Sequence, residues 1–203
     1  MESSGSCRSL LAVKSVWQHY APTRDVLGLL EVFRRMVNGS IRIGMANKVS
    51  SLGRLSLLSY NHLAKYDSPS CYKLCAISRA AGILSSRKKS LRRGFPTREP
   101  YAVRPQLISC YSFKTKNGQL EIPIARGKRL NIPLTKHTIN VISQQGVEVR
   151  SFTLTQNRLC LSIPHYATTL ECTSTVGVDR IFVISRLETT RRPVTTTSRR
   201  QCA

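Results

Sequence analysis

The chain has 203 residues, 41% of them hydrophobic, which is enough to build a buried core. Thirty-two Lys and Arg against ten Asp and Glu give a formal net charge of +22, and such a field attracts polyanions, with nucleic acid as the leading partner. No segment approaches the ~20 apolar residues of a membrane-spanning helix, and the N-terminus lacks a secretory signal, so we expect a cytoplasmic protein with no membrane partner.

The positive charge lies in the body of the chain rather than in one tail. Residues 31–100 hold 14 basic and 3 acidic residues, and residues 101–178 hold 9 and 3. The seven cysteines are odd in number and widely scattered, which favours reduced thiols. Cys71 and Cys75 lie one helical turn apart and could share a metal, but no second Cys or His pair has zinc-site spacing. We therefore expect thiols in the core.

The start of the chain predicts a strand followed by a long helix. The short apolar run from Ser9 to Trp17, ahead of Pro22, is typical of a strand. From Thr23 onward, apolar residues recur at helical spacing, with arginines mostly on the opposite side. The apolar set is Val26, Leu29, Leu30, Phe33, Val37 and Ile41. This pattern predicts a long amphipathic helix.

Two more helices are expected before residue 95. The second begins after the serines at 50–51, either of which can act as N-cap, and runs to about Tyr66. The third begins at the Ser68–Pro69 pair, a good cap and first-turn combination. Its apolar face comprises Tyr72, Ala76, Ala80, Ile83 and Leu84. It ends near Gly94, after a strongly basic run.

The spacing of apolar residues changes to two beyond the Pro-bearing connector that ends at residue 105. In a period of two, one set of residues, Leu107, Ser109, Tyr111 and Phe113, alternates with Ile108 and Cys110. Asn117–Gly118 is the strongest short signal for a hairpin turn. Further short strands are expected at residues 120–124, 130–134, 147–154 and 159–163. Several short antiparallel strands at this interval favour a small barrel, so the predicted fold class is α+β.

Five segments of the chain carry a resemblance to a known family. They read PTRDVLGLLEVFRRMVNGSIRIGM, LSLLSYNHLAKYDSPSCYKLCAISRAAGILSSRKK, NGQLEIPI, RSFTLTQNRLCLSI and VGVDR. Their order and spacing resemble the TnpB family of OrfB-type insertion-sequence transposases, which are RNA-guided DNA endonucleases related to type V CRISPR effectors. The resemblance extends from about Leu11 to Arg180.

The resemblance implies a set of domain boundaries. Residues 1–22 would give the N-terminal strand of a small wedge-type, OB-like antiparallel β-barrel, residues 23–95 an inserted three-helix recognition lobe, and residues 96–172 the remainder of the barrel. Residues 173–203 would begin a RuvC-like (RNase H-like) domain and end in an aberrant tail. The family also implies guide-type RNA and target DNA as partners, Mg²⁺ as the metal of the intact nuclease, and a place in the prokaryotic cytosol or nucleoid.

Asp179, in the VGVDR segment, matches the first carboxylate of the RuvC-like motif, which is both catalytic and metal-binding in the family. Such a site holds two divalent ions between three carboxylates from separate segments. Glu188 is the one acidic residue after Asp179, and it matches no later motif. We therefore expect Asp179 to be a vestigial ligand in an incomplete site, with no Mg²⁺ bound productively. Without the resemblance, Asp179 would be a turn residue after a strand.

The sequence departs from the family after Arg180. A coding run for Asn-Leu-Arg-Asn-Leu-Thr-Val-Gly, a sequence of the kind with which the family continues, becomes Ile-Phe-Val-Ile-Ser-Arg-Leu-Glu when it is read one nucleotide later. That octapeptide is identical to residues 181–188. Our hypothesis is that the reading frame has slipped, and the alternate frame of the gene would test it.

The basic residues expected to contact nucleic-acid phosphates fall into two groups. The third helix and its end supply Arg79, Arg87, Lys88, Lys89, Arg92 and Arg93. The predicted hairpin and the loop after it supply Lys114, Lys116, Arg126, Lys128 and Arg129. The alternative is an ordinary solvated basic face. Tyr72 and Tyr111 have rings that could stack on bases, but their helical and alternating spacing favours core packing.

These features predict a truncated TnpB-like transposase that binds guide RNA and DNA and lacks nuclease activity. Two alternatives stay open. The chain could be an unrelated basic RNA- or DNA-binding module, such as a ribosomal-type protein, or a degenerate product without function. The oligomeric state is not predicted.

Overall fold

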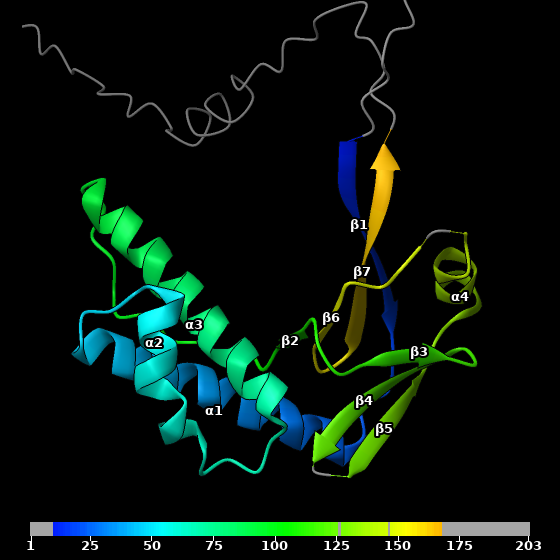
Figure 1. The fold of residues 1–203 in the computed structure, drawn as a ribbon, viewed down its shortest axis with the longest axis horizontal. Helices are drawn as coiled ribbons and strands as arrows, with labels where there is room; N and C mark the ends of the chain where they lie inside the picture. The colour runs from blue at the N-terminus through cyan, green and yellow to red at the C-terminus, as the bar shows by residue number, and fades with distance from the viewer. Residues whose placement is uncertain (1–9, 126, 146, 168–203) are drawn as a thin grey trace, which may run out of the picture. The chain divides into compact units, whose positions relative to one another are not determined.

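The computed structural model describes residues 10–125, 127–145 and 147–167. In this part of the chain one strand comes first, three helices follow, and antiparallel strands then complete two sheets (Figure 1). The predicted α+β class is therefore confirmed. Among these residues, no helix has the length and apolar character needed to cross a membrane.

The first strand and the first helix form where the sequence predicts them. Strand β1 spans Leu10–His19 and helix α1 spans Arg24–Ala46. Thr23 caps α1, because its hydroxyl accepts a hydrogen bond from the Val26 amide at 3.4 Å. All six apolar residues predicted for the helix face are buried. The helical period of these residues therefore reports the core-facing side of α1.

The second predicted helix is shorter in the structure and is followed by a separate turn. Helix α2 spans Leu52–Ser59 and is followed by the 3₁₀ turn η1, Asn61–Leu63. The prediction of one helix to Tyr66 is wrong, although Leu55 and Leu63 are both buried. The prediction fails because the chain changes to the tighter 3₁₀ geometry at η1, before it reaches Tyr66.

Helix α3 spans Ser70–Arg92 and forms a helical layer with α1 and α2. Its N-cap is Pro69 rather than the predicted Ser68, and the Pro69 carbonyl accepts hydrogen bonds from the amides of residues 72 and 73. Gly44 of α1 lies so close to α3 that an added Cβ would meet the Leu84 side chain. The two long helices thus pack tightly at Gly44, where a glycine permits the approach.

The strands form two antiparallel sheets. One sheet has the order β1-β7-β6-β2, and the other has the order β3-β4-β5. The strands after α3 are β2 Leu107–Ser109, β3 Lys114–Lys116, β4 Gln119–Ala125, β5 Lys128–Pro133, β6 Ser151–Leu154 and β7 Arg158–Ala167. The hairpin between β3 and β4 turns at Asn117 and Gly118, with φ values of 50° and 69°. The predicted Asn-Gly turn is confirmed.

Two predicted strands need correction, and one helix was not predicted. The strand expected over residues 107–113 ends at Ser109, and Ser112, with a φ of 61°, lies in the connection from β2 to β3. Strand β6 begins at Ser151 rather than at residue 147. Helix α4, Lys136–Ile142, was not predicted, although the Thr135 hydroxyl accepts the Thr138 amide hydrogen bond as an N-cap.

Long-range side-chain hydrogen bonds join the helices, the connector and the sheets. Asn38 of α1 both donates to the Ala102 carbonyl (3.0 Å) and accepts from the Ala102 amide (2.7 Å), which anchors the connector between α3 and β2. Gln18 of β1 donates to the Pro133 carbonyl at 2.8 Å, and its side-chain oxygen accepts from the Thr135 amide at 2.9 Å. The second pair links the two sheets where β5 ends.

Candidate nucleic-acid interface

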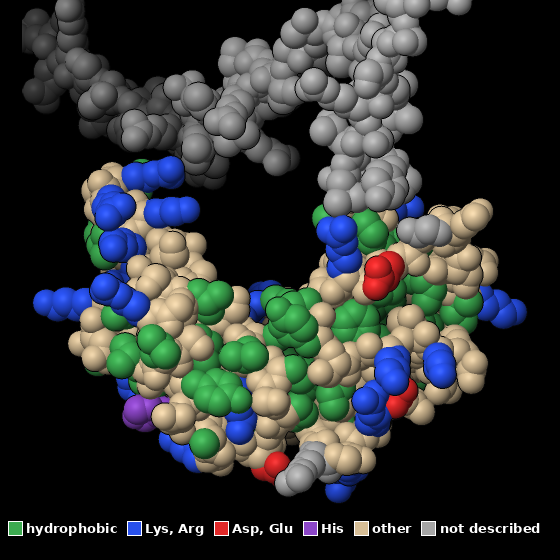
Figure 2. Space-filling view, in the orientation of Figure 1, with side chains coloured by type: hydrophobic (Ala, Val, Ile, Leu, Met, Phe, Trp, Pro, Cys, Tyr) green, Lys and Arg blue, Asp and Glu red, His purple; other side chains and the backbone are tan. Residues whose placement is uncertain are grey.

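The C-terminal end of α3 carries four exposed cations, Lys88, Lys89, Arg92 and Arg93, which we call the α3-end cluster. Figure 2 shows Lys and Arg side chains gathered over this end of the helix. Among the described residues, none of the four forms an ion pair with a carboxylate. Their charge is therefore directed into solvent.

The cluster combines a favourable and an unfavourable electrostatic term. The C-terminal end of a helix carries partial negative charge, so cations in the last turn are stabilised there. Lys88 and Arg92 lie one turn apart, as do Lys89 and Arg93, and like charges at this spacing cost about 0.2–0.5 kcal/mol per pair. A row of phosphates would neutralise this repulsion, which is the chemistry of non-specific nucleic-acid binding.

Arg87 and Arg79 belong to α3 but differ from the exposed cluster. Arg87 is half-buried, and one of its terminal nitrogens lies 3.6 Å from the Met45 sulfur. Arg79 is also half-buried and donates to the Gln106 side-chain oxygen at 2.9 Å. Burial lowers the pKa of the Arg79 guanidinium below its ordinary value. Both arginines therefore have packing roles that the sequence did not indicate.

Arg79 lines a groove of about 710 Å³ between α2, α3 and β2. Other residues at this groove include Cys75, Ile108 and Tyr111. Since Arg79 lies two helical turns before Arg87, the groove begins about 12 Å along α3 from that residue. The groove thus presents one cation with apolar and aromatic neighbours.

The cations predicted on the strands have mixed surroundings. Lys114 and Lys116 are exposed on the same face of β3, because alternate residues of a strand share a face. They line a pocket of about 780 Å³ that also contains Arg150 and Glu148. Arg126 lies outside the described residues. The β3 lysines are therefore available to a phosphate near one competing carboxylate.

Lys128 and Arg129 each have a carboxylate partner. The Lys128 ammonium lies 2.8 Å from the Asp25 carboxylate, and the Arg129 guanidinium lies 3.1 Å from the Glu121 carboxylate. Exposed pairs of this kind contribute only about 0–1 kcal/mol, so a phosphate can compete for the cation. These two residues are consequently weaker candidates than the α3-end cluster.

The structure places the two predicted groups near opposite ends of α3. Arg129 lines a pocket of about 670 Å³ with Ser70 and Lys73, at the N-terminal end of the helix. The α3-end cluster lies at the other end, and a helix of 23 residues is about 34 Å long. The described candidates therefore do not form one patch. They could be contacted together only by a polyanion that extends along the helix.

The two tyrosines considered for base stacking differ in burial. Tyr72 is fully buried, as its helical spacing predicts, and burial raises the pKa of its hydroxyl well above the ordinary value. Tyr111 is 55% exposed, so the prediction of core packing is wrong. The Ser109 hydroxyl accepts the Tyr111 amide hydrogen bond at 3.2 Å, where the chain leaves β2. The alternation of apolar residues continues past this point, but the strand does not.

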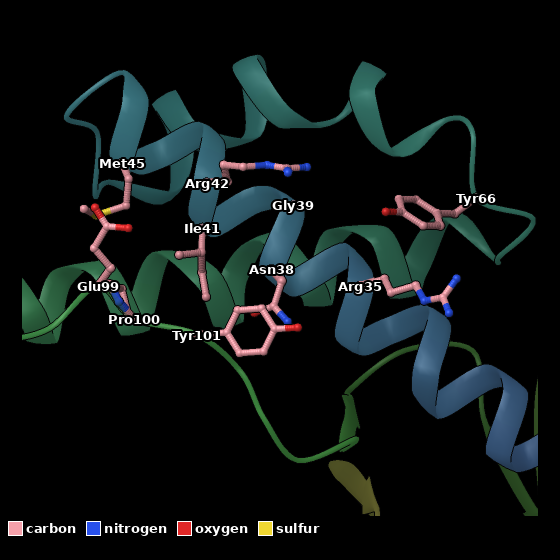
Figure 3. Close-up of a pocket in the computed structure, with 10 residues that line it drawn as sticks. All are labelled: Arg35, Asn38, Gly39, Ile41, Arg42, Met45, Tyr66, Glu99, Pro100 and Tyr101. Atoms are coloured by element: carbon pink, nitrogen blue, oxygen red, sulfur yellow. The ribbon is translucent and has the colours of Figure 1, made fainter.

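A smaller pocket of about 390 Å³ lies where the connector crosses α1, and Figure 3 shows Asn38 and Tyr101 among the residues that line it. The Arg34 guanidinium donates to the Tyr101 hydroxyl at 2.8 Å. Hydrogen bonds from Arg34 and Arg35 hold the pKa of Glu31 at about 2, well below its usual range. These contacts fix the connector on the helix and keep Glu31 ionised.

The four cysteines within the described part of the chain are free thiols, and no metal-binding group of three or more His, Cys, Asp or Glu side chains occurs there. Cys71 and Cys75 are half-buried against the core, close to the prediction, whereas Cys110 is exposed. Burial raises the pKa of the Cys75 thiol, which donates to the Ser109 hydroxyl at 3.7 Å. Asp179, the predicted catalytic and metal-binding residue, lies outside the described residues.

The sequence reasoning missed an exposed aromatic group on β1. Trp17 is 58% exposed, and the Arg158 guanidinium lies 5.3 Å from the centroid of its ring. The sequence places Trp17 in the apolar run of the first strand and indicates no role for it. Its exposure follows from the pairing of β1 with β7, which buries the polar Gln18 together with Val16 on the other face, so the residue types alone do not signal it.

Comparison of the chain with models of known protein families, and with curated proteins, finds no match.

Proposed function

We propose that this chain binds nucleic acid through the phosphate backbone, with the α3-end cluster as its main contact. The observation that supports this proposal is the set of four exposed cations on one helix end, none paired with a carboxylate of the described residues. Long cationic side chains reach phosphates without base identity, so the contact is independent of sequence. The net charge of +22 adds a long-range attraction for the same partner.

We further propose that the protein is TnpB-like, with guide-type RNA and target DNA as partners. Strand β1 pairs with β7 along its whole length, although helices α1 to α4 and strands β2 to β6 separate them in sequence. This pairing supports an arrangement in which the helices are inserted into one β-structure, as a wedge-type barrel with a recognition lobe requires. In that arrangement the α3-end cluster would bind the backbone of a guide RNA and target duplex.

The proposal concerns binding and includes no cleavage step. The resemblance assigns Mg²⁺ to Asp179, and the intact site needs two further carboxylates. Since Asp179 lies outside the described residues, no geometry supports a metal at that position. We propose that the 203-residue chain does not cut nucleic acid by itself.

Binding of a structured RNA and of duplex DNA would test the proposal. The test variant replaces Lys88, Lys89, Arg92 and Arg93 with Gln, and the expected result is at least a tenfold loss of affinity near 0.1 M salt. A matched variant replaces four exposed, dispersed cations with Gln, so that the net charge changes equally. These are Arg24, Arg42, Arg54 and Lys136.

Equal losses in the two variants would overturn the role of the α3-end cluster. If heparin competes as well as RNA at equal charge, the chain is a general polyanion binder, and the unrelated basic module becomes the better description. Cleavage of DNA by the purified chain with Mg²⁺, abolished by Asp179→Asn, would contradict the absence of nuclease activity.

A further inference from the structure

The four-stranded sheet has one buried face and one open face. In an antiparallel sheet, residues paired across strands point to the same side. Val16 pairs with Leu161, and Leu161 with Phe152, and all three are buried. The neighbouring residues on each strand therefore point the other way.

A row of side chains crosses the open face on all four strands. Trp17 pairs with Cys160, Cys160 with Thr153, and Thr153 with Ile108. None of these four residues is buried, and Trp17 is the most exposed of them. The row ends at Ile108, which lines the groove that also contains Tyr111. The open face and the groove are thus continuous.

Trp17 is held by its neighbours but is not covered by them. The Arg158 guanidinium lies 5.3 Å from the centroid of the Trp17 ring, and the His19 ring meets it edge-on at 5.4 Å between centroids. Even so, 58% of Trp17 is exposed, and Val13 on the same face is 63% exposed. Stacking of a flat apolar partner on a large exposed aromatic ring lowers the free energy.

The charge on this face selects the class of partner. The outward residues of β1, β6 and β7 among those described include no acidic side chain; they are Val13, Ser15, Trp17, His19, Ser151, Thr153, Arg158, Cys160, Ser162 and Pro164. The Arg158 guanidinium lies over one face of the Trp17 ring, and Arg79 lines the adjoining groove. A partner that offers flat rings and negative charge together matches this surface.

We propose that the open face of this sheet binds single-stranded nucleic acid by stacking a base on Trp17, with Arg158 beside the backbone phosphate and Tyr111 in the groove as a second stacking ring. The inference rests on the proposed nucleic-acid binding and names the form of the ligand. A base in a duplex is already stacked on both sides, whereas an unpaired base presents a free face to an aromatic side chain. The α3-end cluster would then bind the backbone, and the sheet would bind unpaired bases.

Trp17 is also a direct probe of this contact, because it is the only tryptophan in the chain. Stacking of a base is expected to quench its fluorescence. Titration with a 20-nucleotide oligouridylate should therefore reduce the emission, whereas heparin, which has charge and no bases, should bind without reducing it.

Substitutions at Trp17 separate stacking from charge, with affinity measured by the anisotropy of a labelled oligouridylate. Trp17→Leu should weaken binding about fivefold or more, which is the loss of one stacked base, and Trp17→Phe should retain most of the affinity. Leu57→Ala, at an exposed apolar residue of α2 that lies outside this face and its groove, should leave it unchanged. Heparin affinity should be equal in all four proteins.

The outcomes distinguish this inference from the proposed function. Oligouridylate that binds without quenching, or with equal affinity to the Leu variant, overturns stacking on Trp17 and leaves the face to a protein partner, while phosphate binding stands. If neither oligouridylate nor heparin binds, both proposals fail.

Discussion

Replacing Tyr72 with Phe removes a single oxygen from the interior of the helical layer. Tyr72 is 0% exposed, and its hydroxyl has no hydrogen-bond partner among the described residues. Burial of a hydroxyl without a partner costs about 1–3 kcal/mol, whereas the ring keeps its packing when the oxygen is removed. Tyr72→Phe is therefore expected to raise the free energy of unfolding by about 1 kcal/mol or more.

The same substitution changes how stability depends on pH. Burial raises the pKa of the Tyr72 hydroxyl above that of tyrosine in the unfolded chain, which is about 10. The contribution of this raised pKa to the free energy of unfolding is fully present below pH ~10. It is lost as the pH rises above that value, because only the unfolded chain ionises there. Tyr20, whose pKa is raised to about 12 by burial, contributes in the same direction. The Phe variant should lose less stability above pH ~10 than the natural protein.

Urea unfolding followed by circular dichroism, at neutral pH and near pH 11, measures both effects. Tyr60→Phe serves as the matched control, since Tyr60 is 39% exposed, and its effect should stay within about 0.5 kcal/mol. A Tyr72→Phe variant that is destabilised by more than about 1 kcal/mol would refute the reasoning, because the hydroxyl would then have a favourable partner.

Three further predictions concern helix packing, the connector and acid stability. In thermal unfolding, Gly44→Ala should destabilise the protein by about 1–3 kcal/mol, because the added methyl would crowd side chains of α2 and α3. The control Gly28→Ala, in the same helix, should stabilise it by about 1 kcal/mol, because the added methyl meets nothing within 4 Å. Asn38→Ala should destabilise by about 1–3 kcal/mol in urea, because it leaves the connector backbone unpaired, and Asn140→Ala at an exposed position should not. Glu31→Gln should flatten the fall in the free energy of unfolding between pH ~4.3 and pH 2. The lowered pKa of Glu31 contributes stability above the pKa of the unfolded chain, ~4.3, and this contribution is lost as the pH falls toward about 2. Equal acid profiles for the variant and the natural protein would contradict this.

The long helices were predictable from the sequence because their signal is repeated many times. The buried face of α1 recurs over several turns, so one ambiguous residue does not change the assignment. Helix α4 has only seven residues and two buried side chains, which is too few to reveal a period. Thr135, a residue type that favours the N-cap position, is the one local signal for the start of this helix.

Tyr111 shows a limit of period-two reasoning. The alternation of apolar residues continues through Tyr111, but Ser112 adopts a φ of 61°, which residues other than glycine rarely do. Nothing in the residue type announces that turn. The position is set by the two sheets that β2 and β3 join, which is a property of the whole fold.

The candidate interface was predictable in its residue types but not in its pairings. The cations of the α3-end cluster are consecutive or nearly so in the chain, and the helix brings them together. The ion pair between Lys128 and Asp25 joins residues 103 positions apart, so only the fold could reveal that this cation has a partner. The exposure of Trp17 likewise depends on the pairing of β1 with β7.

The salt dependence of binding to duplex DNA tests the central claim most directly. Each phosphate contact contributes about 0.9 to the slope of log affinity against log salt concentration, so the loss of four contacts should make the slope shallower by about 3.6. We predict this change when all four residues of the α3-end cluster are replaced with Gln, and a change below about 1 in the matched variant at Arg24, Arg42, Arg54 and Lys136. Equal slopes for the natural protein and the cluster variant would contradict the account.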